Sequence, residues 1–394
     1  MTAPGHVERV DQAVADEIVA TVRDWVRREV LPNASRFEHA DEYPIEWVEQ
    51  MRMFGLFGAR IPVEYGGLAL DAHTYARLME ELSYGWMSLA GVLNTHTIAA
   101  NLIALHGTDE QRDRWLPAMV EAAPRAAFSL SEPDAGSDTR ALRCRAERDG
   151  DRYVINGTKM WVTNGERAGL VALAARTPEG VTCFLVEKDP GASFEGISVS
   201  RRIDKLGYKG LETVEMSYVD HEVPVAAVLG GDAGLGRGLH YILGSLELGR
   251  INVAARAVGV ARAALDASMA YAHERETFGT PIIGHQAIAF KLADMATKVE
   301  ASRLLVESAA TKFERGERAD LEAGMAKLFA SETALEVATE AMRIHGGYGY
   351  TTDFPVERYF RDAPLMIIGE GTNEIQRIVI ARALQQRWSE RPQV

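Results

Sequence analysis

One glutamate lies in a setting that suits a general base. Glu370 stands between two glycines, after the apolar run 365–368 and just before residues that predict a helix. We expect Asn373 to cap that helix, with Gln376 three positions on completing a capping box. Burial beside the apolar run would raise the pKa of the carboxyl group, whereas the helix N-terminus would lower it. On position alone, a solvated glutamate that complements the helix dipole is the favoured interpretation.

Other common motifs give no assignment. The segment 230–238 contains five glycines, but it lacks the GxGxxG spacing and the strand–helix context of a dinucleotide fold, so it predicts a joint. The sequence has no phosphate loop, zinc helix or nucleophile elbow. Cys144 and Cys183 are the two cysteines, too few and too dispersed for a disulfide framework or a metal site. No metal is therefore expected.

Composition excludes several classes of protein. Hydrophobic residues make up 47% and charged residues 25%, values typical of a globular protein rather than a disordered one. The net charge of −13 disfavours a nucleic-acid partner, so any phosphate-bearing ligand must meet local arginines. The polar N-terminal residues, Glu8 and Arg9 among them, predict neither a signal peptide nor a membrane span. We expect a cytoplasmic protein without membrane insertion.

Helical periodicity dominates the first third of the chain. Apolar residues recur at helical spacing from 10 to 30, and this first helix is expected to end near Pro32. Further helices are expected at 46–57, 72–81 and 89–105. These patterns predict an N-terminal all-α domain over residues 1–126.

Residues 127–233 show a β pattern instead. Short runs rich in β-branched residues occur at 153–155, 170–175, 181–186 and 213–219. The dipeptides Asn156-Gly157 and Asn164-Gly165 are strong hairpin signals. A small sheet or barrel is therefore predicted as the middle domain.

Long helical segments return in residues 234–394. They are expected at 239–273, 284–315, 318–345 and 373–388. Four long antiparallel helices joined by short turns would pack as a bundle. The fold class predicted for the whole chain is multidomain α+β, with a C-terminal four-helix bundle.

Five phrases spread along the chain resemble the acyl-CoA dehydrogenase family. They are FSLSEPDAGSD (128–138), GTKMWVTNG (157–165), YAHERETFG (271–279) with His285-Gln286, RIHGGYGY (343–350), and Arg361-Asp362 followed by EGTNEIQR (370–377). One such phrase would be weak evidence, whereas five in the family's order are strong evidence. The resemblance covers nearly the full length of the chain.

The resemblance implies a fold, a cofactor and a reaction. The fold is an N-terminal helical domain, a middle β-domain and a C-terminal four-helix bundle, which hold FAD in a homotetramer. The reaction is α,β-dehydrogenation of an acyl-CoA thioester to the trans-2-enoyl-CoA, in which Glu370 abstracts the α-proton and FAD accepts the β-hydride. An electron-transferring flavoprotein is the implied electron acceptor. Some family members carry the base on an earlier helix, at a position matched here by Gly249, and glycine cannot act as a base.

The resemblance also implies which residues contact FAD. In the middle domain they are Phe128, Leu130, Ser131, Trp161 and Thr163, and for the FAD of a neighbouring subunit they are Arg275, Thr277, Phe278 and Gln286. The remaining positions are Arg343, Gly346, Gly347, Thr372 and Glu374. Simpler interpretations stay open: Trp161 as a core aromatic, Arg275 as a cation at a helix end, and Thr372 as a plain capping residue. Arg343 replaces a common glutamine, and His345 a frequent phenylalanine.

Four positions match substrate contacts in the family. Ser137 matches a residue that binds the pantetheine arm, although a Gly-Ser-Asp turn favours serine in any case. Glu247 and Arg250 match residues that contact CoA, and the alternative is an i, i+3 ion pair on a helix surface. Gly371, beside the base, is the fourth.

The acyl group is expected to be short or medium in length, with branched chains included. Three rival functions stay open at this point. They are a dehydrogenase of acyl groups tethered to a carrier protein, an acyl-CoA oxidase, and a non-catalytic helical scaffold that binds no flavin.

Overall fold

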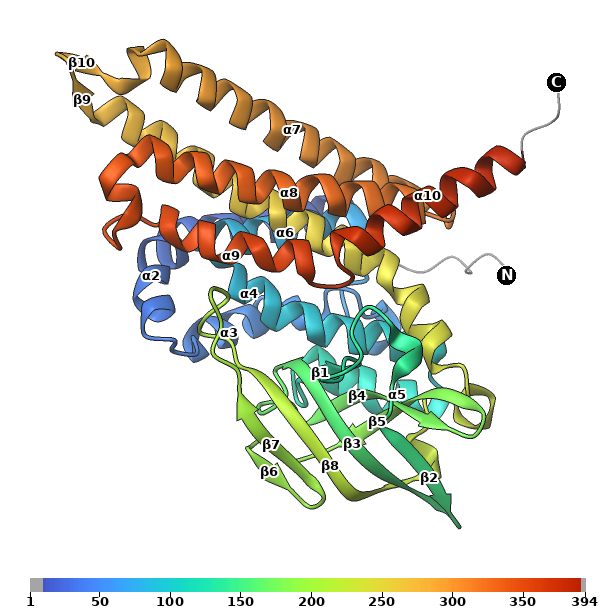
Figure 1. The fold of residues 1–394 in the computed structure, drawn as a ribbon. Helices are drawn as coiled ribbons and strands as arrows, with labels where there is room; N and C mark the ends of the chain where they lie inside the picture. The colour runs from blue at the N-terminus through green and yellow to red at the C-terminus, as the bar shows by residue number, and fades with distance from the viewer. Residues whose placement is uncertain (1–9, 391–394) are drawn as a thin grey trace.

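The computed structural model describes residues 10–390, so Glu8 and Arg9 lie outside the described range. Within it, a helical region, a β-sheet and a second helical region follow one another along the chain (Figure 1). The predicted multidomain α+β fold is confirmed. The division at 126/127 and 233/234 stays a prediction.

The N-terminal region is helical, as predicted. Its α-helices are α1 (Gln12–Trp25), α2 (Leu31–His39), α3 (Ile45–Met53), α4 (Ala72–His106) and α5 (Asp109–Val120). The helix expected to end near Pro32 instead continues to His39, through a π-helical turn at Val26–Val30. The prediction fails because Pro32 lies in the first turn of α2, where a missing N–H and a fixed φ are tolerated.

Helix α4 joins two segments that were expected as separate helices. Its backbone is kinked at Trp86, where φ is −161° and ψ is 116°. It is the one helix in the described range that is long and apolar enough to cross a membrane, and 78% of its most apolar window is buried inside the protein. Gly259 of the later helix α6 (Gly238–Glu274) approaches it closely, since a side chain there would overlap the Glu80 carbonyl oxygen. Helix α4 is thus a core element.

The middle region is a curled eight-stranded sheet. Its strands are β1 (Ala126–Ser129), β2 (Arg145–Asp149), β3 (Arg152–Thr163), β4 (Leu170–Thr177), β5 (Gly180–Glu187), β6 (Ser193–Phe194), β7 (Ile197–Arg202) and β8 (Thr213–Pro224). The strand order is β1-β4-β2-β3-β8-β7-β6, with β5 paired to β4. In Figure 1 the sheet lies beneath the helices, and β1 reaches up toward α4.

Neither Asn-Gly dipeptide forms the predicted hairpin. Asn156-Gly157 lies inside β3, at a bulge where the register against β8 shifts. Asn164-Gly165 does follow β3, but the next strand, β4, pairs with β1 and β5 rather than forming a hairpin with β3. Asn164 instead donates from Nδ2 to the Val92 carbonyl oxygen of α4 at 3.1 Å. A bulge and a tertiary contact have overridden the local turn preference.

The C-terminal region is a helical bundle. Its helices are α6, α7 (Gln286–Glu314), α8 (Asp320–His345), α9 (Val356–Ile368) and α10 (Asn373–Ser389), and the small hairpin of β9 (Glu276–Thr277) and β10 (Thr280–Pro281) joins α6 to α7. Helix α9, which was not predicted, packs against α6 and α8, while α10 packs against α8 (Figure 1). Pro364 inside α9 weakens its helical signal in the sequence.

Candidate active site

The loop between α9 and α10 positions Glu370. The Gly369 N–H donates to the Leu365 carbonyl oxygen at 2.7 Å and ends α9. Glu370 then adopts a φ of +53°, which is uncommon for a residue with a side chain. The N-cap of α10 is Thr372, whose hydroxyl accepts from the Ile375 N–H at 3.4 Å. The predicted cap at Asn373 is therefore wrong.

Asn373 and Gln376 hold this loop in other ways. Asn373 is buried, and its Oδ1 accepts from Lys327 Nζ at 2.8 Å, because a buried ammonium needs an oxygen partner. Gln376 donates from Nε2 to the Gly371 carbonyl oxygen at 3.1 Å. The expected capping box is thus replaced by contacts that fix the residues on either side of Thr372.

The carboxylate of Glu370 is enclosed between α4 and α6. Its Oε1 accepts from Asn94 Nδ2 at 2.6 Å. Its Oε2 is buried and has no hydrogen-bond partner among residues 10–390. On the α6 side lies Gly249, where an added Cβ would overlap Oε2. The candidate base therefore contacts Gly249. This is the position that the resemblance matches to the base of other family members.

Burial determines the protonation behaviour of Glu370. It raises the pKa of the carboxyl group and outweighs the effects that lower it, which come from Arg256, Asn94, Lys327 and Arg250. Burial thus favours the neutral carboxyl group more strongly than the neighbouring cations and the Asn94 amide favour the carboxylate. The solvated glutamate is not found, and the carboxylate has the environment of a general base.

Asn94 contacts the candidate base, although no motif in the sequence indicates it. It belongs to a polar run, Asn94 to Thr97, inside the otherwise apolar helix α4. The neighbouring Thr95 hydroxyl accepts from the Phe128 N–H at 3.1 Å, so this turn of α4 also holds strand β1. A polar run within an apolar helix was the available signal.

Trp161 projects from a second bulge in β3. The register against β8 shifts between Lys159 and Val162, and Trp161 has a φ of +62° with 58% of its surface exposed. It is therefore not the core aromatic that was kept as an alternative. Beside this bulge, the Met160 N–H donates a hydrogen bond to the Ser131 carbonyl oxygen at 2.9 Å. Of the expected middle-domain contacts, Phe128, Leu130, Ser131, Trp161 and Thr163 thus lie on adjoining segments.

A buried ion pair supports these segments. Lys159 Nζ donates to Glu132 Oε1 and to the Leu130 carbonyl oxygen, both at 2.8 Å. Glu132 also accepts from the Arg143 and Cys144 N–H groups at 2.6 and 2.9 Å. The pair fixes the loop that carries Ser131.

Lys159→Met should destabilise the protein by about 3–5 kcal/mol, because it leaves the Glu132 carboxylate buried and unpaired. The free energy of unfolding measured in urea tests this. Arg145→Met on the neighbouring strand is the control, since Arg145 is 60% exposed and pairs with an exposed glutamate; it should change stability by less than about 1 kcal/mol. Equal losses in the two variants would contradict the prediction.

The expected substrate contacts do not form the ion pair that was kept as an alternative. Arg250 Nη1 pairs with Asp320 Oδ1 of α8 at 3.1 Å, while Glu247 Oε2 accepts from the Ala319 N–H at 3.3 Å. Both side chains thus meet the start of α8 rather than each other. Ser137 is exposed in the loop after β1, and Gly371 has a φ of +89° directly after Glu370.

A second group of expected cofactor contacts lies far from Glu370. The hairpin β9–β10 stands at the far end of the bundle from the sheet (Figure 1), and beside it a hollow of about 520 Å³ is lined by Arg275, Thr277, His345, Gly346 and Gly347 among others. Phe278 at the hairpin tip is 99% exposed. Gln286 begins α7, and Arg343 lies in the last turn of α8, where it pairs with Glu340. One chain does not bring this group to Trp161.

Thr372 and Glu374 stay beside the base. Thr372 caps α10, which agrees with its interpretation as a plain capping residue. The Glu374 side chain, in the first turn of α10, is 76% exposed. Both follow Glu370 closely in the chain, at the start of α10.

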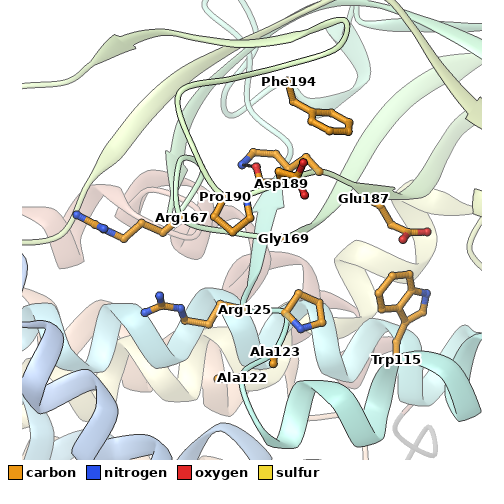
Figure 2. A pocket seen from close by; sticks show the side chains of 12 residues that line it. Trp115, Ala122, Ala123, Arg125, Arg167, Gly169, Glu187, Asp189, Pro190 and Phe194 are labelled. Atoms are coloured by element: carbon orange, nitrogen blue, oxygen red, sulfur yellow. Dashed lines mark hydrogen bonds between the residues drawn. The ribbon is translucent and has the colours of Figure 1, made fainter.

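Another hollow, of about 550 Å³, lies between α5 and the end of β5. Figure 2 shows Arg125 and Arg167 on one side of it and Glu187 and Trp115 on the other. None of the residues predicted for the site lines it. The candidate site thus does not include this crevice, and Glu370 itself is surrounded by α4, α6 and the α9–α10 loop.

Comparison with known proteins defines the class of protein. Residues 13–123, 127–220 and 236–385 match the N-terminal, middle and C-terminal domains of acyl-CoA dehydrogenase. An acyl-CoA dehydrogenase of Bacillus subtilis is 40% identical over 369 residues, which cover 92% of this chain and 96% of that protein. The chain belongs to the acyl-CoA dehydrogenase family.

Solved structures agree with this assignment. Butyryl-CoA dehydrogenase from Megasphaera elsdenii superposes with a TM-score of 0.90 at 34% identity, covering 94% of this chain and 98% of that one. A chain in a structure described as an electron transferring flavoprotein of Acidaminococcus fermentans gives a TM-score of 0.89 at 38% identity, covering 94% and 97%. Members of this family are FAD-dependent oxidoreductases that act on CH–CH groups, so the expected cofactor and enzyme class are confirmed.

The residues present fit a flavin nucleotide. Trp161 offers an exposed indole on which a planar ring can stack. Arg275 offers a guanidinium for a diphosphate in a chain of negative net charge. In the same hollow, His345 Nε2 is a buried polar atom with no partner within the described part of the chain.

Proposed function

We propose that this protein oxidises an acyl-CoA thioester to the trans-2-enoyl-CoA, with Glu370 as the base. FAD, when bound, supplies the acceptor for the hydride that leaves Cβ. Glu370 takes the α-proton, and its backbone N–H would polarise the thioester carbonyl. The proposed FAD contacts are those named above, and Ser137, Glu247, Arg250 and Gly371 are the proposed CoA-thioester contacts.

One observation carries this proposal. Oε2 of Glu370 is buried without a partner, whereas Oε1 is held by Asn94. A buried carboxylate oxygen with a free lone pair is poised to accept a proton, and burial keeps it basic. Burial of Oε2 also keeps water, which would compete for the base, away from it.

We further propose a setting for the enzyme. The cofactor contacts at the β9–β10 end would serve the FAD of a neighbouring copy, which supports a homotetramer. An electron-transferring flavoprotein would reoxidise the flavin, and the cytoplasm and fatty-acid β-oxidation are the proposed location and pathway class.

The test is anaerobic mixing of the purified yellow protein with short- and medium-chain acyl-CoA thioesters, branched ones included, while the visible flavin absorbance is followed. Bleaching by some of them supports the proposal. Reoxidation by an electron-transferring flavoprotein rather than by dioxygen then separates a dehydrogenase from an oxidase.

Two other outcomes would contradict the proposal. A yellow protein bleached only by acyl groups on a carrier protein would identify a carrier-dependent dehydrogenase. A colourless protein that takes up no FAD would identify a scaffold.

Asn94→Leu should move the acidic limb of the pH–rate profile for flavin reduction to higher pH. The amide of Asn94 stabilises the ionised carboxylate, so its loss raises the pKa of Glu370 further. The base must be ionised, and the rate therefore falls as the pH falls through this pKa. Stopped-flow reduction at a series of pH values measures the limb; an unchanged or lower position would contradict the role given to Asn94.

A further inference from the structure

The surface that faces Glu370 is more polar than an alkyl chain requires. On α6, Gly249, Asn252 and Arg256 recur at i, i+3 and i+7 and so share one face of the helix. All three are buried. Gly249 meets the Glu370 carboxylate, so the other two continue the same face away from the base.

Arg256 is a buried cation that forms no close ion pair within the described residues, although its charge lowers the pKa of the Glu370 carboxyl group. Only 4% of its surface is exposed, and its Nε and Nη2 atoms have no hydrogen-bond partner in the described chain. Its guanidinium carbon lies 5.2 Å from the centre of the Tyr208 ring, and the guanidinium also interacts with the Tyr208 side chain through a hydrogen bond. The neighbouring arginines of α6 differ, since Arg250 pairs with Asp320 and Arg262 pairs with Glu80 and Glu81. A buried guanidinium left in this state is unfavourable unless a ligand completes it.

Tyr208 ties Arg256 to the active site. Its N–H donates to Asp362 Oδ1 at 2.6 Å, which fixes the loop before β8, and its φ is +57°. Its hydroxyl lies against Gly91 of α4, where any side chain would overlap it. Gly91 is one turn before Asn94, the residue that binds Glu370. Arg256, Tyr208, Gly91 and Asn94 are therefore contiguous with the base.

A second unpartnered atom lies on the same face. Asn252 donates from Nδ2 to the Tyr75 hydroxyl at 3.0 Å, but its Oδ1 is buried without a partner in the described range. The face of α6 that continues from Gly249 thus offers both hydrogen-bond donors and an acceptor.

We propose that the acyl group taken by this enzyme ends in an oxygen function, a carboxylate in its strongest form, which binds the guanidinium of Arg256. This inference rests on the proposed function and names its substrate class. Arg256 follows Gly249 by seven residues, about 10 Å along the helix, and helical side chains lean back toward the N-terminus. A short acyl chain therefore spans from the base to the guanidinium. A methyl-terminated chain would leave Nε and Nη2 of Arg256 without a partner, and sites with unpaired polar groups discriminate strongly between substrates.

The experiment compares matched thioesters on the FAD-loaded enzyme. Butyryl-, pentanoyl- and hexanoyl-CoA are set against thioesters of the same lengths that end in a carboxylate or a hydroxyl group, and kcat/KM for anaerobic flavin reduction is measured. At the preferred length, an oxygen-terminated substrate should exceed its methyl-terminated counterpart by at least about tenfold. Preference for the carboxylate identifies recognition of charge, and preference for the hydroxyl identifies a neutral acceptor. Faster reduction by the methyl-terminated thioester at every length would overturn the inference while leaving the proposed function intact.

Variants of Arg256 test whether its side chain causes the preference for oxygen-terminated thioesters. Arg256→Met should abolish it, whereas Arg262→Met should retain it, because Arg262 on the same helix is already paired with Glu80 and Glu81. Arg256→Lys, which keeps the charge but loses the bidentate geometry, should weaken the preference and serves if the methionine variant does not fold. A full preference in Arg256→Met would overturn the assignment to Arg256. If no thioester of either series bleaches the flavin, the proposed function itself fails.

Discussion

Glu370→Gln should bind FAD and acyl-CoA normally and yet reduce its flavin roughly 10³-fold more slowly or worse, because only the base is removed. The amide is close in size to the carboxylate and can still meet Asn94, so the loop between α9 and α10 should keep its shape. Single-turnover flavin reduction measures the loss, and the shift of the flavin spectrum on adding ligand measures binding.

A matched control is Glu147→Gln, which removes a carboxylate that is 71% exposed on strand β2. It should reduce its flavin at the normal rate. Reduction of the Glu370→Gln flavin within a few-fold of the normal rate would transfer the role of base to another group.

Gly249→Ala should slow flavin reduction by about 10²-fold. A methyl group at this position overlaps Oε2 of Glu370 and would displace the carboxylate from its position for removing the α-proton. Alanine favours a helix by about 1 kcal/mol over glycine, so the variant tests whether glycine is kept for the base or for the fold. The rate constant for anaerobic reduction is the measurement.

Gly244→Ala on the same helix provides the comparison. An added Cβ at Gly244 meets no atom within 4 Å, so this variant should gain the helix preference without losing rate. If the two alanine variants reduce their flavin equally fast, Gly249 does not make room for the carboxylate.

The sequence predicts elements wherever one periodic pattern persists. Helices α6, α7, α8 and α10 begin and end within a few residues of their predicted limits, because their repeats are long enough to outweigh single exceptions. The errors fall where local rules compete with tertiary contacts. Pro32 was expected to stop a helix that continues, and Asn156-Gly157 was expected to turn a strand that instead bulges.

The site is less predictable because its neighbours come from distant segments. Glu370 was found through a phrase, but Asn94 lies 276 positions earlier, and nothing in either stretch points to the other. The same holds for Gly249, whose contact with Glu370 exists only after α6 and the α9–α10 loop meet. The sequence could indicate competing influences on the pKa of Glu370, whereas their balance depends on burial, which only the folded chain has.

Helix boundaries also depend on such distant contacts. Asn373 was expected to cap α10 by its type alone, yet Lys327 of α8 takes its side-chain oxygen. Thr372 is left to cap the helix, and the chain turn that carries Glu370 is shortened by one residue as a result.

The left-handed backbone conformation of Glu370 suits glycine better than glutamate. The stability of the fold therefore gives no reason for a glutamate at this position. A glycine at this position would relax a φ of +53° and remove a buried ionisable group, both of which favour the native state. The native state is thus expected to be less stable with Glu370 than with glycine at this position. Under the proposed role of Glu370 as the base, lineages released from selection for turnover are expected to lose this carboxylate early while keeping the scaffold.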